Sequence, residues 1–169
     1  MQKVLFLCTG NSARSILAEA ILNRVGKGRF KAFSAGSQPK HEPNPYALEL
    51  LRSLGYGLSS FRSKSWEEFS TDLDGKKMHH IITVCDNAAG EACPIWPGKP
   101  ASGHWGIPDP AAAIGSEKDI QLAFLTAYAQ LSDRIGRFVS MPIEEMKKKE
   151  IRELMEEIGS FSGATGGIR

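Results

Sequence analysis

A cysteine and an arginine near the N-terminus have the types and spacing of an oxyanion-binding nucleophile. Cys8 and Arg14 enclose five small or polar residues in the stretch CTGNSAR. The apolar run over 3–7 predicts a buried strand before them, and apolar periodicity predicts a helix after them. A cysteine just before a helix N-terminus meets oriented backbone N–H groups, which favour thiolate over thiol. The motif therefore predicts a nucleophilic Cys8 with a lowered pKa.

The loop between these two residues can surround a tetrahedral oxyanion. Gly10 lets the backbone turn inward so that successive N–H groups point at one anion, and the Arg14 guanidinium can bind two oxygens at once. Ser15 could donate a hydrogen bond to the Cys8 sulfur, and Asn11 could brace the loop. An inert buried cysteine explains neither the arginine nor the small residues, and no Gly-Lys-Ser/Thr of a Walker-type loop follows. The predicted oxyanion-binding residues are Thr9, Gly10, Asn11, Ser12, Ala13 and Arg14.

The other two cysteines are candidates for redox chemistry or metal binding. Cys85 follows an apolar run over 80–84, and Cys93 lies eight positions later in a segment flexible enough to bring both sulfurs together. An odd count of three cysteines argues against a structural disulfide framework. Zinc is the alternative, but the spacing matches no compact zinc pattern, so we predict no metal site. Such a site would need His79, His80 or His104.

Asp109 lies late in the chain between two prolines. Taken by itself it reads as a turn aspartate, because Asp-Pro pairs are common in turns. Thiolate attack on a tetrahedral centre must also expel a strongly basic oxygen, so the chemistry requires a positioned acid. Both interpretations of Asp109 stand on the residues alone.

Strands and helices alternate along the chain, which predicts an α/β fold with a parallel sheet. Ser116 with Asp119 resembles a capping box, and Asn44 is a candidate helix cap. The predicted architecture is a three-layer α/β/α sandwich around a central, mainly parallel sheet of about four strands. Strands are expected over 3–7, 30–35, 80–84 and 104–106. Helices are expected from about 16 and over 45–54, 64–69, 116–138 and 142–158.

These elements place the chemical residues at one edge of the sheet. Ligands of open parallel sheets bind beyond the carboxyl ends of the strands. Cys8, Cys85 and the segment of Asp109 all follow predicted strands. The sequence therefore predicts that they meet at that edge.

Composition limits the class of protein. The chain has 169 residues, of which 41% are hydrophobic and 24% charged, and this suits one compact domain. The net charge of +2 is too small to indicate binding to nucleic acid or to an anionic membrane. No secretory signal and no apolar stretch of about 20 residues is present, so we expect a cytoplasmic protein without a membrane partner. The expected organisation is a catalytic domain over 1–140, a helical extension over 141–158 and a disordered tail over 159–169.

The stretch 4–19, VLFLCTGNSARSILAE, resembles the active-site loop of the low-molecular-weight protein tyrosine phosphatase superfamily, and within it the arsenate reductases of that fold. The resemblance covers roughly residues 3–138. It includes FSAG at 33–36, TVCD at 83–86, Cys93-Pro94, and HWG at 104–106 with Asp109-Pro110.

This resemblance implies a role for each candidate residue. Cys8 would attack arsenate, Arg14 and the loop amides would bind it, Ser15 would stabilise the thiolate, and Asp109 would protonate the leaving oxygen. Cys85 would then attack the Cys8 sulfur and release arsenite, and Cys93 would attack Cys85. The disulfide would be reduced by thioredoxin or by a glutathione or glutaredoxin system. No cofactor is implied, and phosphate would compete with arsenate.

Two rival functions use the same loop. A tyrosine phosphatase would hydrolyse phosphotyrosine or small phosphate esters without needing a second thiol. Tyrosine phosphatases of this fold often carry neighbouring tyrosines before the acid, where this chain has HWG at 104–106. The other rival is a non-enzymatic oxyanion-binding module, against which the complete set of Cys8, Arg14 and Asp109 argues.

The chain departs from the pattern of the family in two places. The loop from Cys85 to Cys93 is one residue longer than in thioredoxin-coupled reductases, which bears on the last relay step. Some members bind potassium through a Glu, a Ser and an Asp. Glu19 and Ser34 match the first two, but Lys64 falls on the third, so we expect its ammonium group to replace the ion.

Overall fold

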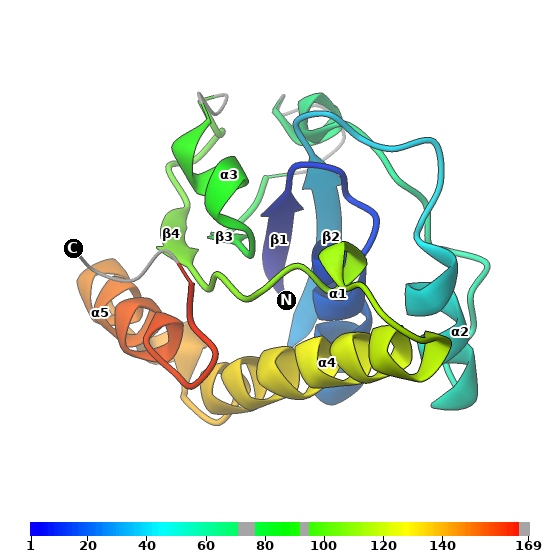
Figure 1. Ribbon diagram of the computed structural model, residues 1–169. Coiled ribbons are helices and arrows are strands. Elements are labelled where there is room, and N and C mark those ends of the chain that lie inside the picture. Colours follow the sequence, from blue (N-terminus) through cyan, green and yellow to red (C-terminus); the bar gives the residue numbers. More distant parts are fainter. Residues whose placement is uncertain (71–76, 92–94, 166–169) are drawn as a thin grey trace.

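A computed structural model of the chain describes residues 1–70, 77–91 and 95–165. In it the chain forms a four-stranded parallel sheet in the order β2-β1-β3-β4. The strands are β1 (Gln2–Cys8), β2 (Phe30–Gly36), β3 (His80–Thr83) and β4 (Ala101–His104). β1 pairs with both β2 and β3, so it lies inside the sheet with its carboxyl end at the top in Figure 1. The predicted α/β fold with a parallel sheet is confirmed.

Helices cover the two faces of the sheet unequally. Side chains alternate between the two faces along a strand, and Val4 and Phe6 lie on the face that packs against the long helices. The opposite face buries Leu5 and Leu7 under the short η1 segment with Trp66 and Phe69. Figure 1 shows α1 beside β2, α4 across the lower part of the view, and α5 beside β4. The helices are α1 (Arg14–Val25), α2 (Pro45–Ser53), α3 (Asp86–Gly90), α4 (Glu117–Val139) and α5 (Lys148–Gly159); the short 3-10 turns are η1 (Trp66–Phe69), η3 (Pro110–Ala112) and η4 (Ile143–Glu145).

Both predicted helix caps are present. The Asn44 side chain accepts from the backbone N–H of Tyr46 at 2.9 Å, with Pro45 in the first turn of α2. Ser116 and Asp119 form a reciprocal capping box at the start of α4. These interactions are local, which explains why the sequence predicted them.

Two predicted element boundaries are wrong. The last strand is β4 at 101–104 rather than 104–106, because its register with β3 ends where Thr83 faces His104. The helix predicted over 142–158 is broken into η4 and α5 by extended backbone at Met146 and Lys147. The Lys147 N–H donates to the Glu150 carboxylate at 2.7 Å, which starts a new helix at that point.

The C-terminal extension packs against the sheet edge. The buried Trp105 indole donates to the Met155 carbonyl at 3.0 Å, which ties α5 to the end of β4. Residues 160–165 belong to the segment predicted as a disordered tail. Within them, Thr165 N–H donates to the Gly106 carbonyl at 3.0 Å, and the Arg134 guanidinium donates to two carbonyls, of Phe161 and Ser162. Residues 166–169 lie outside the described part of the chain.

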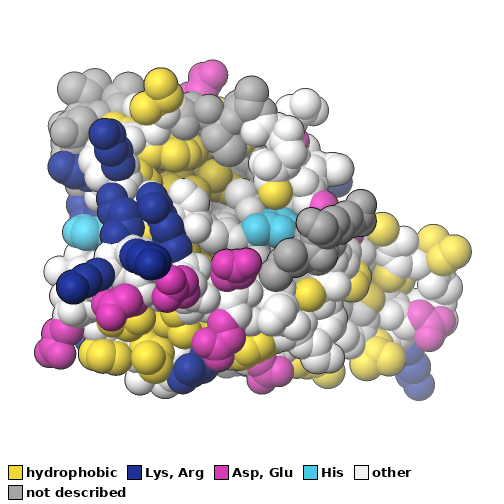
Figure 2. Space-filling model, turned by 90° about the vertical axis from the view of Figure 1, so that its left-hand side faces the viewer, with side chains coloured by type: hydrophobic (Ala, Val, Ile, Leu, Met, Phe, Trp, Pro, Cys, Tyr) yellow, Lys and Arg dark blue, Asp and Glu magenta, His cyan; other side chains and the backbone are white. Residues whose placement is uncertain are grey.

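Two cavities among the described residues lie away from the carboxyl edge of the sheet. A groove of about 460 Å³ runs between α2 and α4. A cavity of about 440 Å³ opens near the amino ends of β1 and β3 and is lined by Lys3, Lys77, Lys99 and Lys148. Figure 2 shows Lys and Arg side chains gathered on one side of the face that carries β4 and α5. No helix among the described residues is long and apolar enough to cross a membrane.

Candidate active site

The predicted oxyanion loop joins the end of β1 to the first turn of α1. Cys8 is the last residue of β1 and Arg14 the first of α1, so residues 9–13 form the whole connection. Gly36 pairs with Cys8 in the register of β1 and β2, and a Cβ on it would lie 2.4 Å from the Thr9 carbonyl oxygen. Glycine is therefore required there for β2 to lie against the loop.

Asn11 braces the loop from inside. Its backbone is left-handed, with φ 44°, and its side chain is fully buried. The amide donates to Ser15 Oγ at 2.8 Å and accepts from the Lys64 backbone N–H at 3.0 Å. Asparagine tolerates this backbone region better than most residues, so its side chain fixes a conformation that its backbone permits. Because Ser15 Oγ accepts from Asn11, its own hydrogen stays available for the predicted bond to Cys8.

Arg14 and Asp109 meet across the mouth of the loop. Arg14 Nη1 donates to the Ile107 carbonyl at 3.1 Å, and Nη2 lies 3.6 Å from Asp109 Oδ2. Arg14 Nε is buried and has no hydrogen-bond partner among the described residues, which leaves a donor for an oxyanion. Asp109 Oδ1 accepts from the Ala111 N–H at 3.0 Å, so it also caps η3. Asp109 is therefore both a turn residue and a candidate general acid.

These residues line a cavity of about 260 Å³, small enough to suit a tetrahedral oxyanion. The cavity contains Cys8, most of the loop, Arg14 and Asp109, and no described residue of its lining is aromatic. The sequence did not predict four further lining residues: Gln38, Lys40, Asn87 and Ala111. The Gln38 and Lys40 backbone N–H groups donate to loop carbonyls at 3.0 and 2.9 Å. Their position just after β2, the neighbour of β1, was the signal that could have found them.

The structure brings Cys85 beside Cys8, 77 positions apart in the sequence. Both thiols are buried, and the strongest influence on the pKa of each is the other sulfur. The neighbouring Cys8 thiol lowers the pKa of Cys85 to about 5. Cys85, followed by burial, raises the pKa of Cys8. The lowered pKa predicted for Cys8 is therefore found in the pair of thiols rather than in Cys8 alone.

One shared proton explains this result. The first proton leaves the pair easily because the remaining S–H group stabilises the new thiolate. Arg14 lowers the pKa of both sulfurs, and the Ala88 N–H supports Cys85 at 3.4 Å. The negative charge therefore belongs to the pair rather than to one sulfur.

We expect this pair to be alkylated well below the pH at which an ordinary thiol reacts. The thiolate exists above its lowered pKa, so iodoacetamide labelling against pH should show a first midpoint near 5, compared with about 8.5 for an unperturbed cysteine. Phosphate in the cavity should slow the labelling of Cys8. A midpoint at or above that of a free thiol would contradict the shared-proton arrangement.

Thr9 connects the oxyanion loop to the segment that carries Cys85. Its hydroxyl oxygen lies 3.6 Å from Cys85 Sγ and donates to Glu91 Oε1 at 3.0 Å. Glu91 directly follows α3 and is partly exposed. Cys93, the predicted second relay cysteine, lies outside the described residues.

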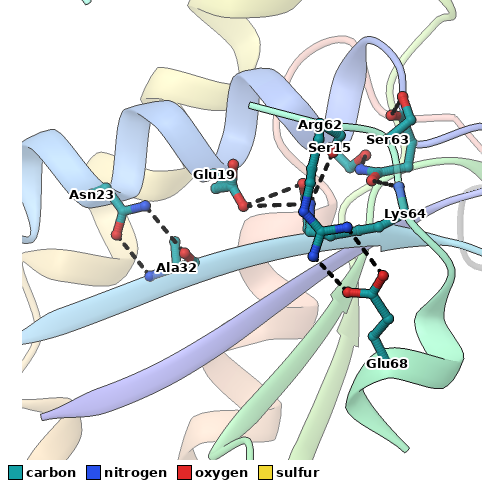
Figure 3. Close-up of polar contacts among 10 residues, drawn as sticks. Ser15, Glu19, Asn23, Ala32, Arg62, Ser63, Lys64 and Glu68 are labelled. Carbon is teal, nitrogen blue, oxygen red and sulfur yellow. Dashed lines mark hydrogen bonds and ion pairs between the residues drawn. The ribbon is translucent and has the colours of Figure 1, made fainter. Parts of the chain in front are cut away.

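Lys64 takes the place of the third potassium ligand of the resembling family and lies beside Glu19. Its ammonium group is buried 4.0 Å from Glu19 Oε1 and donates to the Arg62 carbonyl at 3.0 Å. Ser34 Oγ donates to the same Glu19 oxygen at 3.4 Å. Figure 3 shows Lys64 directed toward Glu19, while Arg62 pairs with Glu68. Burial raises the pKa of Glu19 and lowers that of Lys64, and the opposite charge of each partner opposes the shift.

We expect the protein to need no potassium, because the Lys64 ammonium already neutralises Glu19. Turnover and melting temperature should be equal in KCl and NaCl of the same ionic strength. Lys64→Asp should cost about 3 kcal/mol of unfolding free energy, since it leaves buried carboxylates without a cation. Thermal unfolding in the two salts tests this, and potassium should recover part of the loss only in the variant. A potassium-dependent wild type would show that Lys64 does not replace the ion.

The remaining candidates serve packing. Trp105 is fully buried and Trp66 nearly so. His79 and His80 lie at the amino end of β3, at the opposite end from Cys85. Among the described residues no group of three or more His, Cys, Asp or Glu side chains could hold a metal ion.

Residues 3–152 match the family described as low molecular weight phosphotyrosine protein phosphatase. The chain belongs to this family. The match extends past residue 140, where the catalytic domain was expected to end, and takes in the first part of α5. The curated and solved relatives then show which members of the family the chain is similar to.

The similar proteins include arsenate reductases. One from Bacillus licheniformis is 34% identical over 138 residues, which cover 80% of this chain and 93% of that protein. The crystal structure of one from Archaeoglobus fulgidus is 28% identical with a TM-score of 0.63, covering 82% of this chain and 99% of the other. A thioredoxin-dependent one from Corynebacterium glutamicum is 26% identical with a TM-score of 0.60, covering 83% and 62%.

Proposed function

We propose that this protein reduces arsenate to arsenite. The observation that carries the proposal is a second buried thiol, Cys85, beside Cys8 and the cavity that Cys8 lines. A phosphatase has no use for a thiol at that place. The names of the similar proteins support the same conclusion.

The reaction begins with substrate binding over Cys8. Arsenate is held by the amides of residues 9–13 and by Arg14, whose buried Nε is without a partner in the described structure. The Cys8 thiolate attacks arsenic, and Asp109, at the mouth of the cavity, protonates the departing oxygen. Ser15 donates its hydroxyl hydrogen to the thiolate. An arsenic atom bound to Cys8 results.

The second half of the reaction uses the neighbouring thiol. The Cys85 thiolate attacks Cys8 Sγ, forming a disulfide while the electron pair of the sulfur–arsenic bond stays on arsenic. Cys93 then attacks Cys85 and frees Cys8. We assign Cys93 this role from the resemblance. The electrons come from thioredoxin or from a glutathione or glutaredoxin system, and we place the enzyme in the reducing cytoplasm, where such thiols stay reduced.

Steady-state turnover with each reductant tests the proposal. Wild-type protein should produce arsenite with thioredoxin or with glutathione and glutaredoxin, and inorganic phosphate should inhibit it competitively. Hydrolysis of para-nitrophenyl phosphate, measured in parallel, should be the weaker activity. Efficient hydrolysis of phosphotyrosine without arsenate turnover under any reductant would instead establish a phosphatase.

A further inference from the structure

The buried Cys85 thiol has an oxygen neighbour that leads to a carboxylate. Thr9 Oγ1 lies 3.6 Å from Cys85 Sγ and gives its hydrogen to Glu91 Oε1 at 3.0 Å. A hydroxyl group has only one hydrogen. Because that hydrogen is directed to Glu91, the Thr9 oxygen has a lone pair that can accept from Cys85 once this sulfur carries a proton. The three side chains form a continuous route from sulfur to carboxylate.

In the proposed reduction, Cys85 carries a proton after the first step and must lose it before the second step. In the ligand-free protein the two sulfurs share one proton. When Cys8 attacks arsenate as a thiolate, that proton stays on Cys85. The attacking species in thiol–disulfide chemistry is the thiolate, so Cys85 must lose this proton before it attacks Cys8.

The other described neighbours of Cys85 cannot take the proton. The Ala88 N–H is a donor at 3.4 Å, and the Arg14 guanidinium has donors but no acceptor atom. Both stabilise a thiolate without accepting anything. Asp86 is adjacent in sequence, but the contacts of its carboxylate among the described residues are with His104 at 2.8 Å and Thr165 at 3.1 Å, not with the Cys85 sulfur.

We propose that Glu91 accepts the Cys85 proton through the Thr9 hydroxyl, an inference that rests on the proposed arsenate reduction. The Cys85 S–H bond breaks as its proton passes to Thr9 Oγ1, and the Thr9 proton passes to Glu91 Oε1. The thiolate then attacks Cys8 Sγ. The new S–S bond oxidises two sulfurs, and arsenic keeps the electron pair of the broken bond, passing from As(V) to As(III).

Glu91 is placed to return the proton to water. It is partly exposed, whereas Cys85 is 2% exposed. A proton that reaches the carboxylate can therefore leave to solvent before the next turnover. Thr9 belongs to the oxyanion loop, so the same residue that helps enclose arsenate also opens the proton route from the relay thiol.

Glu91→Gln tests the route, because glutamine keeps the shape but is not a base. Prereduced enzyme is mixed with arsenate, quenched at intervals from pH 5.5 to 9, and the Cys8–Cys85 disulfide is quantified by mass spectrometry after digestion. The variant should form this disulfide about 100-fold more slowly at neutral pH. Its rate should rise about tenfold per pH unit, since hydroxide must replace the carboxylate as base, while the wild-type rate levels off. Glu91→Asp should recover part of the rate.

Glu156→Gln is the matched control, because Glu156 is exposed on α5 and loses the same charge. It should behave as wild type. Equal pH profiles for Glu91→Gln and wild type, or a slowing that is the same at every pH, would overturn the proton route while arsenite production still upholds the function. Absence of arsenite from the wild type would instead refute the proposed function, and the inference with it.

Discussion

Cys8→Ser should abolish arsenate reduction and phosphate-ester hydrolysis together, each by about 10³-fold or more. A serine hydroxyl is hardly ionised near neutral pH, and it cannot form the disulfide that releases arsenite. Cys8 is the only cysteine among the described residues that line the cavity, so no other described side chain there can replace it as nucleophile. Arsenite production and para-nitrophenyl phosphate hydrolysis measure the two losses.

Phosphate binding separates a chemical loss from a collapsed loop. The amides of residues 9–13, Arg14 and the Asn11 brace are all retained in Cys8→Ser. The variant should still be stabilised by phosphate in thermal unfolding. Turnover close to that of the wild type in either assay would show that the loop is not the active site.

Cys85→Ser should lower the rate of arsenate reduction by about 10³-fold or more. The same variant should keep phosphate-ester hydrolysis within about tenfold of the wild-type rate. Hydrolysis needs Cys8, Arg14 and Asp109, and water can resolve a phosphorylated cysteine. Reduction also needs a thiol to remove the Cys8 sulfur from arsenic, and a hydroxyl cannot do this. The ratio of the two activities is therefore the measurement.

Removal of Cys85 also removes the partner with which Cys8 shares its proton. The alkylation midpoint of Cys8 should then move to the value that the loop amides and Arg14 set by themselves, still below that of a free thiol. Mass spectrometry should show no Cys8 disulfide with residue 85 after exposure to arsenate. Arsenate reduction at the wild-type rate in this variant would refute the proposed function.

The oxyanion loop was predictable because it is contiguous. A buried strand, a small-residue turn and a helix start are read within residues 3–16, and the resulting geometry depends on neighbours in the chain. The capping box of Ser116 and Asp119 is equally local. The sequence by itself also determined the fold class, since alternating strands and helices allow few arrangements other than a parallel sheet.

The contacts between distant segments were decided by the tertiary structure. Pairing of β1 with β3 brings Cys85 to Cys8, and through that contact each thiol shifts the pKa of the other. Thr9 reaches Glu91 across 82 positions, and no local pattern marks Glu91 as chemically important. The end of β4 and the break before α5 depend likewise on register and on packing against the sheet. Local propensity sets which elements form, but proton sharing and hydrogen bonding depend on distances of a few ångströms that only the packed fold establishes.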